Sequence, residues 1–392
     1  MKQYDVVIAG GAMAGMTLAL ALDRLSCGSF RIAVVEPYQA DQQQHPGFDS
    51  RAIALSQGTV AILRQFDLWR HILDVATPIQ HIHVSDRGHA GMTEISREQS
   101  GGEPLGFVVE LADVGRAFAQ LAEQSSAITM LCPDSVASIE RQLERTQVRL
   151  QSGSELSAKL LVAADGALST CCQQLGLSLQ EHDFNQVAVI ANVVCSQPHH
   201  FRAFERFTDS GPVALLPMSE GRMSLVWCLR PDEAGQVMAL NDQQFLARLQ
   251  RAFGWRLGEM KATGARACYP LLLRYRPENI SHRFAIVGNA AQTLHPIAGQ
   301  GFNLGIRDVA SLAEEIMRSP EDPGQYQVLS AFRNRRQQDR QATIALTSGL
   351  VEIFSNNWLP MRIGRNLGLA AVDHCTPLKA PLLKRTLGLV KR

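Results

Sequence analysis

The sequence lacks any long apolar segment. No uninterrupted apolar run in the 392 residues approaches the about 18 residues that a transmembrane helix needs. The chain begins Met-Lys-Gln-Tyr-Asp and enters an apolar stretch directly, without the pattern of a secretory signal peptide. We therefore expect a cytoplasmic protein, or one attached peripherally to the inner membrane.

The cysteines also lack the spacing of a disulfide framework or a metal site. The chain has 8 cysteines, but no pair has C-x-x-C spacing, and Cys171 and Cys172 are adjacent. This argues against a disulfide framework or a metal site and indicates reduced thiols. The apolar fraction of 46% and the charged fraction of 19% are ordinary for a globular protein, which excludes a disordered chain. The length suggests two or three domains with room for a cofactor between them.

Charge is nearly balanced but unevenly placed. The net charge is +1, yet residues 331–392 carry 11 Lys and Arg against 3 Asp and Glu. This segment either forms an amphipathic surface for a membrane or for partner proteins, or packs as a helix whose charges are merely solvated. We expect no nucleic-acid partner. The apolar and basic residues that alternate here are Trp358, Leu359, Met361, Ile363, Leu367, Leu369, Leu382, Leu383 and Leu387, with Arg362, Arg365, Lys379, Lys384 and Arg385.

The order of apolar patterns predicts an α/β fold. Residues 4–9 read as a strand, 13–25 as a helix and 31–36 as a second strand, which together form a βαβ unit with a parallel sheet. Between 185 and 275 short strands and turns predict a mostly antiparallel sheet with one helix, 242–253. Residues 284–287 return to a buried strand, and the remainder is predicted to be helical.

Three segments carry candidate binding chemistry, of which the first is a glycine-rich loop. It reads Gly10-Gly11-Ala12-Met13-Ala14-Gly15, between the first strand and the first helix. This fits the dinucleotide fingerprint G-x-G-x-x-G except at Ala12. The glycines allow a tight turn, and the helix N-terminus offers amide donors to a pyrophosphate. Glu36 ends the second strand, where an acidic side chain binds ribose hydroxyls.

The second and third segments follow two later strands. Asp165 and Gly166 end a buried strand at 161–164. The third begins with Gly288 and Asn289, where a strand would deliver the asparagine to a cofactor sugar. Glycines that follow would let backbone amides approach a planar ring closely. The remaining candidate residues of this segment are His295, Pro296, Gly299, Gln300, Gly301 and Asn303.

These three segments resemble the fingerprint, DG motif and GD motif of the flavoprotein aromatic hydroxylases of the para-hydroxybenzoate hydroxylase type. The resemblance covers nearly the whole chain and is strongest to the ubiquinone-biosynthesis branch. Asn289 stands where the family normally has aspartate, but an amide can still donate and accept hydrogen bonds. The segments that carry the resemblance to that branch are 85–91, 204–207, 215–218, 224–227 and 288–303.

The resemblance implies a Rossmann-like FAD-binding domain interrupted by a mostly antiparallel β substrate domain and followed by a helical C-terminal segment. The expected boundaries assign 1–78, 104–180 and 278–330 to the FAD-binding domain, 79–103 and 181–277 to the substrate domain, and 331–392 to the C-terminal segment.

The same resemblance implies an FAD-dependent monooxygenase. NADPH or NADH would bind transiently and reduce FAD, and O2 would form a flavin C4a-hydroperoxide that hydroxylates a polyprenylated methoxyphenol. Arg51 would contact the flavin side of the cofactor. His295 and Pro296 are the catalytic candidates, although a structural role fits His295 equally well. Two alternatives stay open, a hydroxylase of a small soluble aromatic and a flavin-bearing scaffold subunit of a biosynthetic complex.

Overall fold

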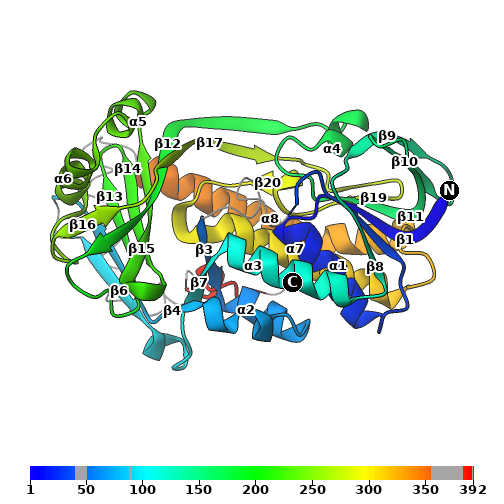
Figure 1. The fold of residues 1–392 in the computed structure, drawn as a ribbon, viewed down its shortest axis with the longest axis horizontal. Helices are drawn as coiled ribbons and strands as arrows, with labels where there is room; N and C mark the ends of the chain where they lie inside the picture. Colours follow the sequence, from blue (N-terminus) through cyan, green and yellow to red (C-terminus); the bar gives the residue numbers. More distant parts are fainter. Residues whose placement is uncertain (40–50, 89–90, 355–382, 391) are drawn as a thin grey trace.

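The computed structural model describes residues 1–39, 51–88, 91–354, 383–390 and 392. Two large sheets lie at opposite ends of an elongated molecule, with α7 and α8 running between them (Figure 1). Each sheet buries its own apolar cluster, and α8 contacts a strand of each. The eight helices of the described residues are α1 (Met13–Leu25), α2 (Gln57–Gln65), α3 (Leu111–Gln124), α4 (Thr170–Gln174), α5 (Pro231–Met238), α6 (Asp242–Phe253), α7 (Gln300–Arg318) and α8 (Tyr326–Phe354).

The first sheet is parallel at its centre. Within the described residues it has eight strands, and β19, β11, β1, β2 and β8 pair in parallel in that order. β1 is buried on both faces, as expected for a central parallel strand covered by helices. The strands are β1 (Lys2–Ala9), β2 (Ile32–Val35), β8 (Ile128–Leu131), β9 (Val136–Arg141), β10 (Thr146–Leu150), β11 (Glu155–Ala163), β18 (Ile280–Ser281) and β19 (Phe284–Ile286).

The second sheet is mostly antiparallel, with nine strands in the described part of the chain. The 79–103 excursion joins it through β5, which pairs in parallel with β13. One face packs on α5 and α6, and the other is directed toward α8. The strands are β5 (His81–Asp86), β6 (Met92–Ser96), β12 (Gln180–Cys195), β13 (Arg202–Thr208), β14 (Gly211–Pro217), β15 (Arg222–Leu229), β16 (Met260–Thr263), β17 (Ala267–Tyr275) and β20 (Gln292–Thr293).

A small third sheet lies between the two large ones. It orders β3 (Ala52–Ser56), β7 (Gly106–Glu110) and β4 (Thr77–Ile79). Short 3₁₀ turns complete the fold, and two of them matter for the site, η5 (Gly288–Ala290) and η6 (Ile297–Gly299). The others are η1 (Trp69–His71), η2 (Leu73–Val75), η3 (Arg97–Ser100) and η4 (Ser219–Gly221).

The predicted helix at 13–25 and the antiparallel character of 185–275 are confirmed, but the expectation of a single helix there is wrong. The structure places α5 before α6. Pro231 occupies the first turn of α5 and is followed by Asp232 and Glu233, which are favourable at a helix N-terminus. These residues favour the start of a helix. A helix of 8 residues is too short to show a clear apolar periodicity in the sequence.

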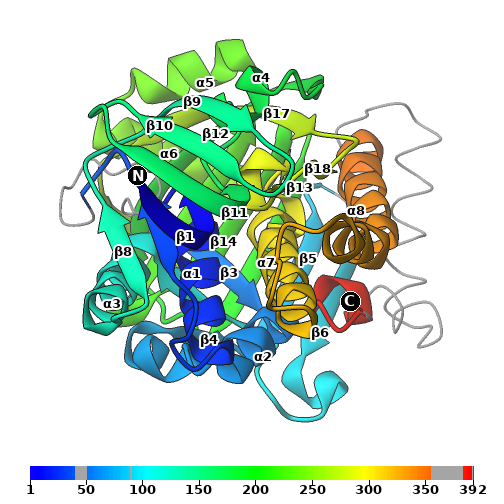
Figure 2. The same ribbon diagram turned by 90° about the vertical axis from the view of Figure 1, so that its right-hand side faces the viewer.

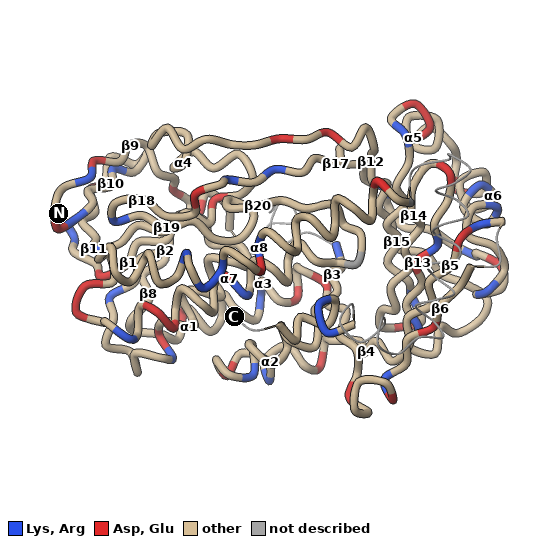
Figure 3. Tube along the Cα trace, turned by 180° about the vertical axis from the view of Figure 1, so that it is seen from behind, with Lys and Arg blue, Asp and Glu red and all other residues tan. Residues whose placement is uncertain are grey.

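The described end of the chain packs back onto the protein. Leu387 is 4% exposed and lies in a cluster with Leu105 and Met218, and its carbonyl accepts a hydrogen bond from the Gly58 amide. Figure 2 shows this terminal piece beside α7 and α8. Charged residues of both signs are interspersed along the described chain (Figure 3). No helix in the described ranges combines the length and apolarity that crossing a bilayer requires.

Candidate active site

The carboxyl ends of four parallel strands bring the predicted segments together. Ala9 at the end of β1 pairs with Val35 of β2 and with Ala163 of β11, and Ala163 pairs with Ile286 of β19. The glycine loop, Glu36, Asp165 and Gly288 follow these strands directly. They therefore meet at one edge of the sheet, where open α/β sheets bind their ligands.

Close backbone contacts explain two glycines of the loop. Gly10 has φ +98°, and a Cβ on it would lie 2.4 Å from the carbonyl oxygen of Ala164. A Cβ on Gly15 would lie 1.9 Å from the carbonyl oxygen of Gly10. Ala12 is the N-cap of α1 and provides no side-chain cap, so the first amides of this 13-residue helix are open to a pyrophosphate. Met13 and Ala14 form the first turn of the helix.

Glu36 is hydrogen-bonded to the glycine loop, and its role in binding the ribose stays a prediction. Its Oε2 accepts a hydrogen bond of 2.6 Å from the Gly11 amide, and its Oε1 accepts one of 3.0 Å from the Tyr38 amide. The side chain is only 6% exposed. The carboxylate thus fixes the shape of the loop that would receive the pyrophosphate.

We predict that Glu36→Ala weakens FAD binding at least about tenfold. A hydrogen bond to a charged group contributes roughly 1.5–3 kcal/mol, which corresponds to about one order of magnitude or more in the dissociation constant. Titration of the apoprotein with FAD measures the effect. Ala12→Gly is the matched control in the same loop and should be neutral or slightly favourable. Unchanged FAD affinity in Glu36→Ala would refute the role of this residue.

Asp165 offers an acceptor that the protein leaves unused. Its Oδ2 accepts a hydrogen bond of 3.1 Å from the Cys171 amide, while its buried Oδ1 has no hydrogen-bond partner in the described structure. Buried polar atoms are rarely left unpaired, so this oxygen fits a ligand hydroxyl. Gly166 has φ +86°, and a Cβ on it would meet no protein atom within 4 Å, which leaves space beside it. These residues fit an FAD molecule at this edge.

Gly288 and Gly305 bring α7 against the first turn of α1. A Cβ on Gly288 would lie 2.6 Å from the Ala14 Cβ, and one on Gly305 would lie 3.0 Å from the Gly288 Cα. Asn289, next to this contact in η5, is exposed. The third segment therefore reaches the same edge as the glycine loop.

Residues 295–301 form the turn that leads into α7, here called the 295–301 turn. Pro296 caps η6, and Gly299 has φ +61°, where an added Cβ would lie 3.6 Å from the Ala54 Cβ. Gly301 is different, because its φ is ordinary and the nearest protein atoms would lie 3.8 Å from a Cβ, at Leu294. Protein packing alone does not require glycine at 301, whereas a ligand lying on this backbone would.

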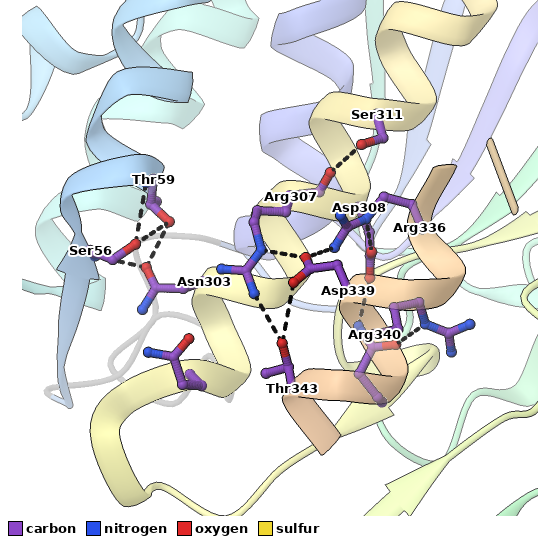
Figure 4. Close-up of polar contacts among 12 residues, drawn as sticks. Ser56, Thr59, Asn303, Arg307, Asp308, Ser311, Arg336, Asp339, Arg340 and Thr343 are labelled. Carbon is purple, nitrogen blue, oxygen red and sulfur yellow. Dashed lines mark hydrogen bonds and ion pairs between the residues drawn. The ribbon is translucent and has the colours of Figure 1, made fainter. Parts of the chain in front are cut away.

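Asn303 and Gln300 bind protein groups rather than facing an open site. Asn303 accepts hydrogen bonds from the Ser56 amide at 2.8 Å and the Thr59 hydroxyl at 2.7 Å (Figure 4). Its Nδ2 donates to the carbonyls of Ala54 and Gly299. Gln300 donates to the carbonyl of Thr386 in the terminal piece. Asn303 thereby ties the 295–301 turn to β3 and α2.

His295 is held on both ring nitrogens. The Ile297 amide donates to Nδ1 at 3.2 Å, so Nε2 carries the proton and donates to Gln186 Oε1 at 3.0 Å. Burial lowers the pKa of His295 to about 4, so the ring is neutral at pH 7. Of the two roles that the sequence left open, this geometry favours the structural one.

Arg51 precedes β3 and lies over the ring of Tyr269, with 5.3 Å between the guanidinium carbon and the ring centroid. Tyr269 belongs to β17 of the antiparallel sheet. The pair therefore joins the small third sheet to the antiparallel sheet near the 295–301 turn. The contact of Arg51 with the flavin side of the cofactor stays a prediction, and its Tyr269 partner was not predicted from the sequence.

A buried charge network fixes α7 to α8 behind the turn (Figure 4). Asp339 accepts hydrogen bonds from Arg307 at 2.8 Å and Arg336 at 2.6 Å, and Asp308 accepts one from Arg336 at 2.7 Å. Arg340 extends the network to the Arg276 carbonyl of the antiparallel part. Burial alone would raise the pKa of Asp339, but the charges of Arg307 and Arg336 outweigh burial and lower it.

Sequence reasoning assigned no role to this network. Arg336 and Arg340 were counted in the basic C-terminal segment, yet these two residues are only 0% and 6% exposed. Part of the positive charge of 331–392 is therefore internal. The available signal was the i, i+3 spacing of Arg336 and Asp339, which places opposite charges on one helix face.

Comparison with known proteins agrees with this geometry. The sequence model of the family described as "FAD binding domain" matches residues 3–347. The chain belongs to this family of FAD-binding hydroxylases. The ubiquinone hydroxylase UbiL of Rhodospirillum rubrum is 33% identical over 100% of this chain and 91% of its own length. The 3-demethoxyubiquinol 3-hydroxylase of Escherichia coli is 31% identical over 98% of both chains.

A solved structure shares the fold of this hydroxylase. The p-nitrophenol 4-monooxygenase of Pseudomonas putida superposes with a TM-score of 0.82 over 99% of both chains, at 18% identity. At that identity the likeness shows the fold alone. The predicted α/β fold class is confirmed, and FAD is the cofactor of this monooxygenase family.

Proposed function

We propose that this hydroxylase oxidises a polyprenylated methoxyphenol in ubiquinone biosynthesis. The observation that carries the proposal is the similarity, along nearly the full length, to proteins named ubiquinone hydroxylase and 3-demethoxyubiquinol 3-hydroxylase. Within this branch the sequence motifs also resemble those of 2-octaprenyl-6-methoxyphenol hydroxylase.

The proposed reaction assigns distinct tasks to cofactor and protein. When bound and reduced by NADPH or NADH, FAD supplies the activated oxygen from O2. The loop 10–15, Glu36 and Asp165 would hold the adenosine and pyrophosphate parts. The 295–301 turn would support the ring system, and the apolar interface between the two sheets would keep water away from it.

The decisive experiment is the product spectrum of a strain in which the gene is deleted. Accumulation of a methoxylated prenylphenol supports the proposal and identifies the ring position. Purified protein should also bind FAD noncovalently and consume NADPH or NADH in step with product. A preference for polar soluble aromatics would point to the smaller-substrate alternative. Absence of turnover by the isolated protein would favour the scaffold alternative.

The C-terminal segment has a proposed second role in reaching the substrate. Each buried CH₂ contributes about 0.8 kcal/mol, so a polyprenyl phenol stays in a membrane or on a lipid-carrying protein. We propose that the basic segment meets that surface. Most residues that motivated this idea, including Trp358, Arg362, Arg365 and Lys379, lie outside the described residues. Described Leu383 and Leu387 pack inside the protein.

Removal of residues 383–392 is therefore expected to lower stability and FAD content. The deletion takes Leu387 out of its cluster and leaves Gln300 without the Thr386 carbonyl. Thermal melting and the flavin-to-protein absorbance ratio measure the change.

The docking role is tested separately by Arg362→Glu with Arg365→Glu, which should reduce flotation with anionic vesicles while the melting temperature stays constant. Equal flotation of this double variant and the unaltered protein would contradict the docking role.

A further inference from the structure

Glu205 stands on the face of the antiparallel sheet that is directed toward the 295–301 turn. Side chains alternate along a strand, so Ala203, Glu205 and Phe207 of β13 share one face. Phe204, between them, packs on the opposite face with the cluster of α6. Ala203 and Phe207 instead join clusters that include residues of the other domain.

Those two clusters bracket Glu205 at the turn. Ala203 lies in the cluster of Ala54, whose Cβ is the atom nearest to a Cβ added on Gly299. Phe207 packs with Ile297 of η6 and with Val351 of α8. β13 therefore contacts the 295–301 turn and its neighbour Ala54 through the residues on either side of Glu205. The Glu205 side chain lies between these two contacts.

The surroundings of Glu205 are apolar and give its carboxyl group no partner. Val84, Ala214 and Val226 occupy the neighbouring positions across the sheet. Among the described residues, the Glu205 carboxyl group has neither a hydrogen bond nor an ion pair, and burial alone shifts its pKa. Glu205 is partly accessible to solvent, which is consistent with its place between the two contacts. A carboxyl group in apolar surroundings is costly unless a ligand supplies a partner.

We propose that Glu205 accepts the hydroxyl proton of the phenol substrate. This inference rests on the proposed function, because it requires a phenol whose ring lies between the sheet and the 295–301 turn. In the step, the phenol O–H bond breaks, its electron pair stays on the phenolate oxygen, and the proton moves to the carboxylate oxygen. After the product leaves, the protonated Glu205 carboxyl group releases this proton to solvent, which restores the carboxylate. The phenolate ring is richer in electrons and accepts oxygen more readily.

The acidity of Glu205 suits this task. Burial raises the pKa of Glu205 to about 7. A phenol has a pKa of about 10, and a base works best when its own pKa lies near the pH of operation. Two other titratable groups of this interface do not replace Glu205. Burial holds the pKa of the Cys228 thiol well above its usual range, and the His295 ring is engaged on both nitrogens. The remaining groups near this face are Asp86 of β5, Tyr269 of β17 and Arg51.

The test compares Glu205→Gln with the unaltered holoenzyme on two short-chain methoxyphenols. One has an ordinary hydroxyl group, and the other carries ring fluorines that make it already ionised at the assay pH. Glutamine keeps the size and can still form a hydrogen bond, but it cannot take the proton. We expect hydroxylation of the ordinary phenol to fall by about 10²–10⁴-fold, with H2O2 released instead. The ratio of variant to unaltered enzyme should recover with the fluorinated phenol.

Two controls separate a chemical role from a structural one. Glu94→Gln makes the same change on β6 of the same sheet, where Glu94 pairs with Arg202 at a half-exposed position, and should leave both substrates unaffected. FAD content and melting temperature verify folding, and Glu205→Ala with added formate replaces the Gln variant if that variant does not fold. Restored turnover with formate then supports the role, and no restoration overturns it.

The outcomes also distinguish this inference from the proposed function. A loss of equal size on both phenols, or activity within about twofold of the unaltered enzyme on the ordinary phenol, overturns the role of Glu205. If the unaltered holoenzyme hydroxylates neither phenol, the proposed function itself fails.

Discussion

Gly301→Val is expected to abolish hydroxylation while the protein still folds and melts cooperatively. A side chain at 301 would meet protein atoms only at 3.8 Å, and the position has no positive φ, so the backbone tolerates valine. Valine has a higher helix propensity than glycine, so the substitution adds no propensity cost in α7. The same side chain would occupy the space in which the flavin ring is predicted to lie against the backbone. Turnover, FAD content and circular dichroism together measure the effect.

Gly305→Val is the matched control on the same helix. A Cβ there would lie 3.0 Å from the Gly288 Cα, so the substitution forces α7 away from η5 and should damage folding itself. The two variants thus lose activity for different reasons, which the melting curves separate. Full activity in Gly301→Val would show that the flavin lies elsewhere.

Asp339→Ala is expected to destabilise the protein by about 3–5 kcal/mol. The carboxylate binds Arg307 and Arg336, whose side chains are 1% and 0% exposed, and its removal leaves uncompensated buried charge. Urea denaturation measures the free energy of unfolding. Because α7 carries the residues that follow the 295–301 turn, FAD affinity should fall with stability.

An exposed pair provides the comparison for Asp339→Ala. Asp209 is 58% exposed and lies 3.5 Å from Arg87, so Asp209→Ala should cost less than about 1 kcal/mol. The pKa of Asp339 is lowered in the folded state, so its contribution is present above the unfolded pKa and is lost as the pH falls through the folded pKa. Equal losses in the two variants would contradict the importance of the buried network.

Several site residues could be placed from the sequence because their signals are local. The Gly10–Gly15 loop, Glu36 and Asp165 each follow a strand directly, and parallel strands present their carboxyl ends at one edge. Long-range contacts escaped the same reasoning. Asn303 lies in a cofactor motif, but its side chain binds Ser56, which is 247 residues away.

The sequence by itself determined the parallel order of the first strands, the edge at which the cofactor motifs meet and the family to which they belong. Apolar periodicity and glycine spacing are patterns of a few neighbouring residues, so they can be recognised without knowledge of the fold. Only the tertiary structure decided that His295 is engaged on both nitrogens and that Arg336 is internal. It also decided that Glu205 faces the 295–301 turn, because burial and partner choice depend on which distant segments pack together.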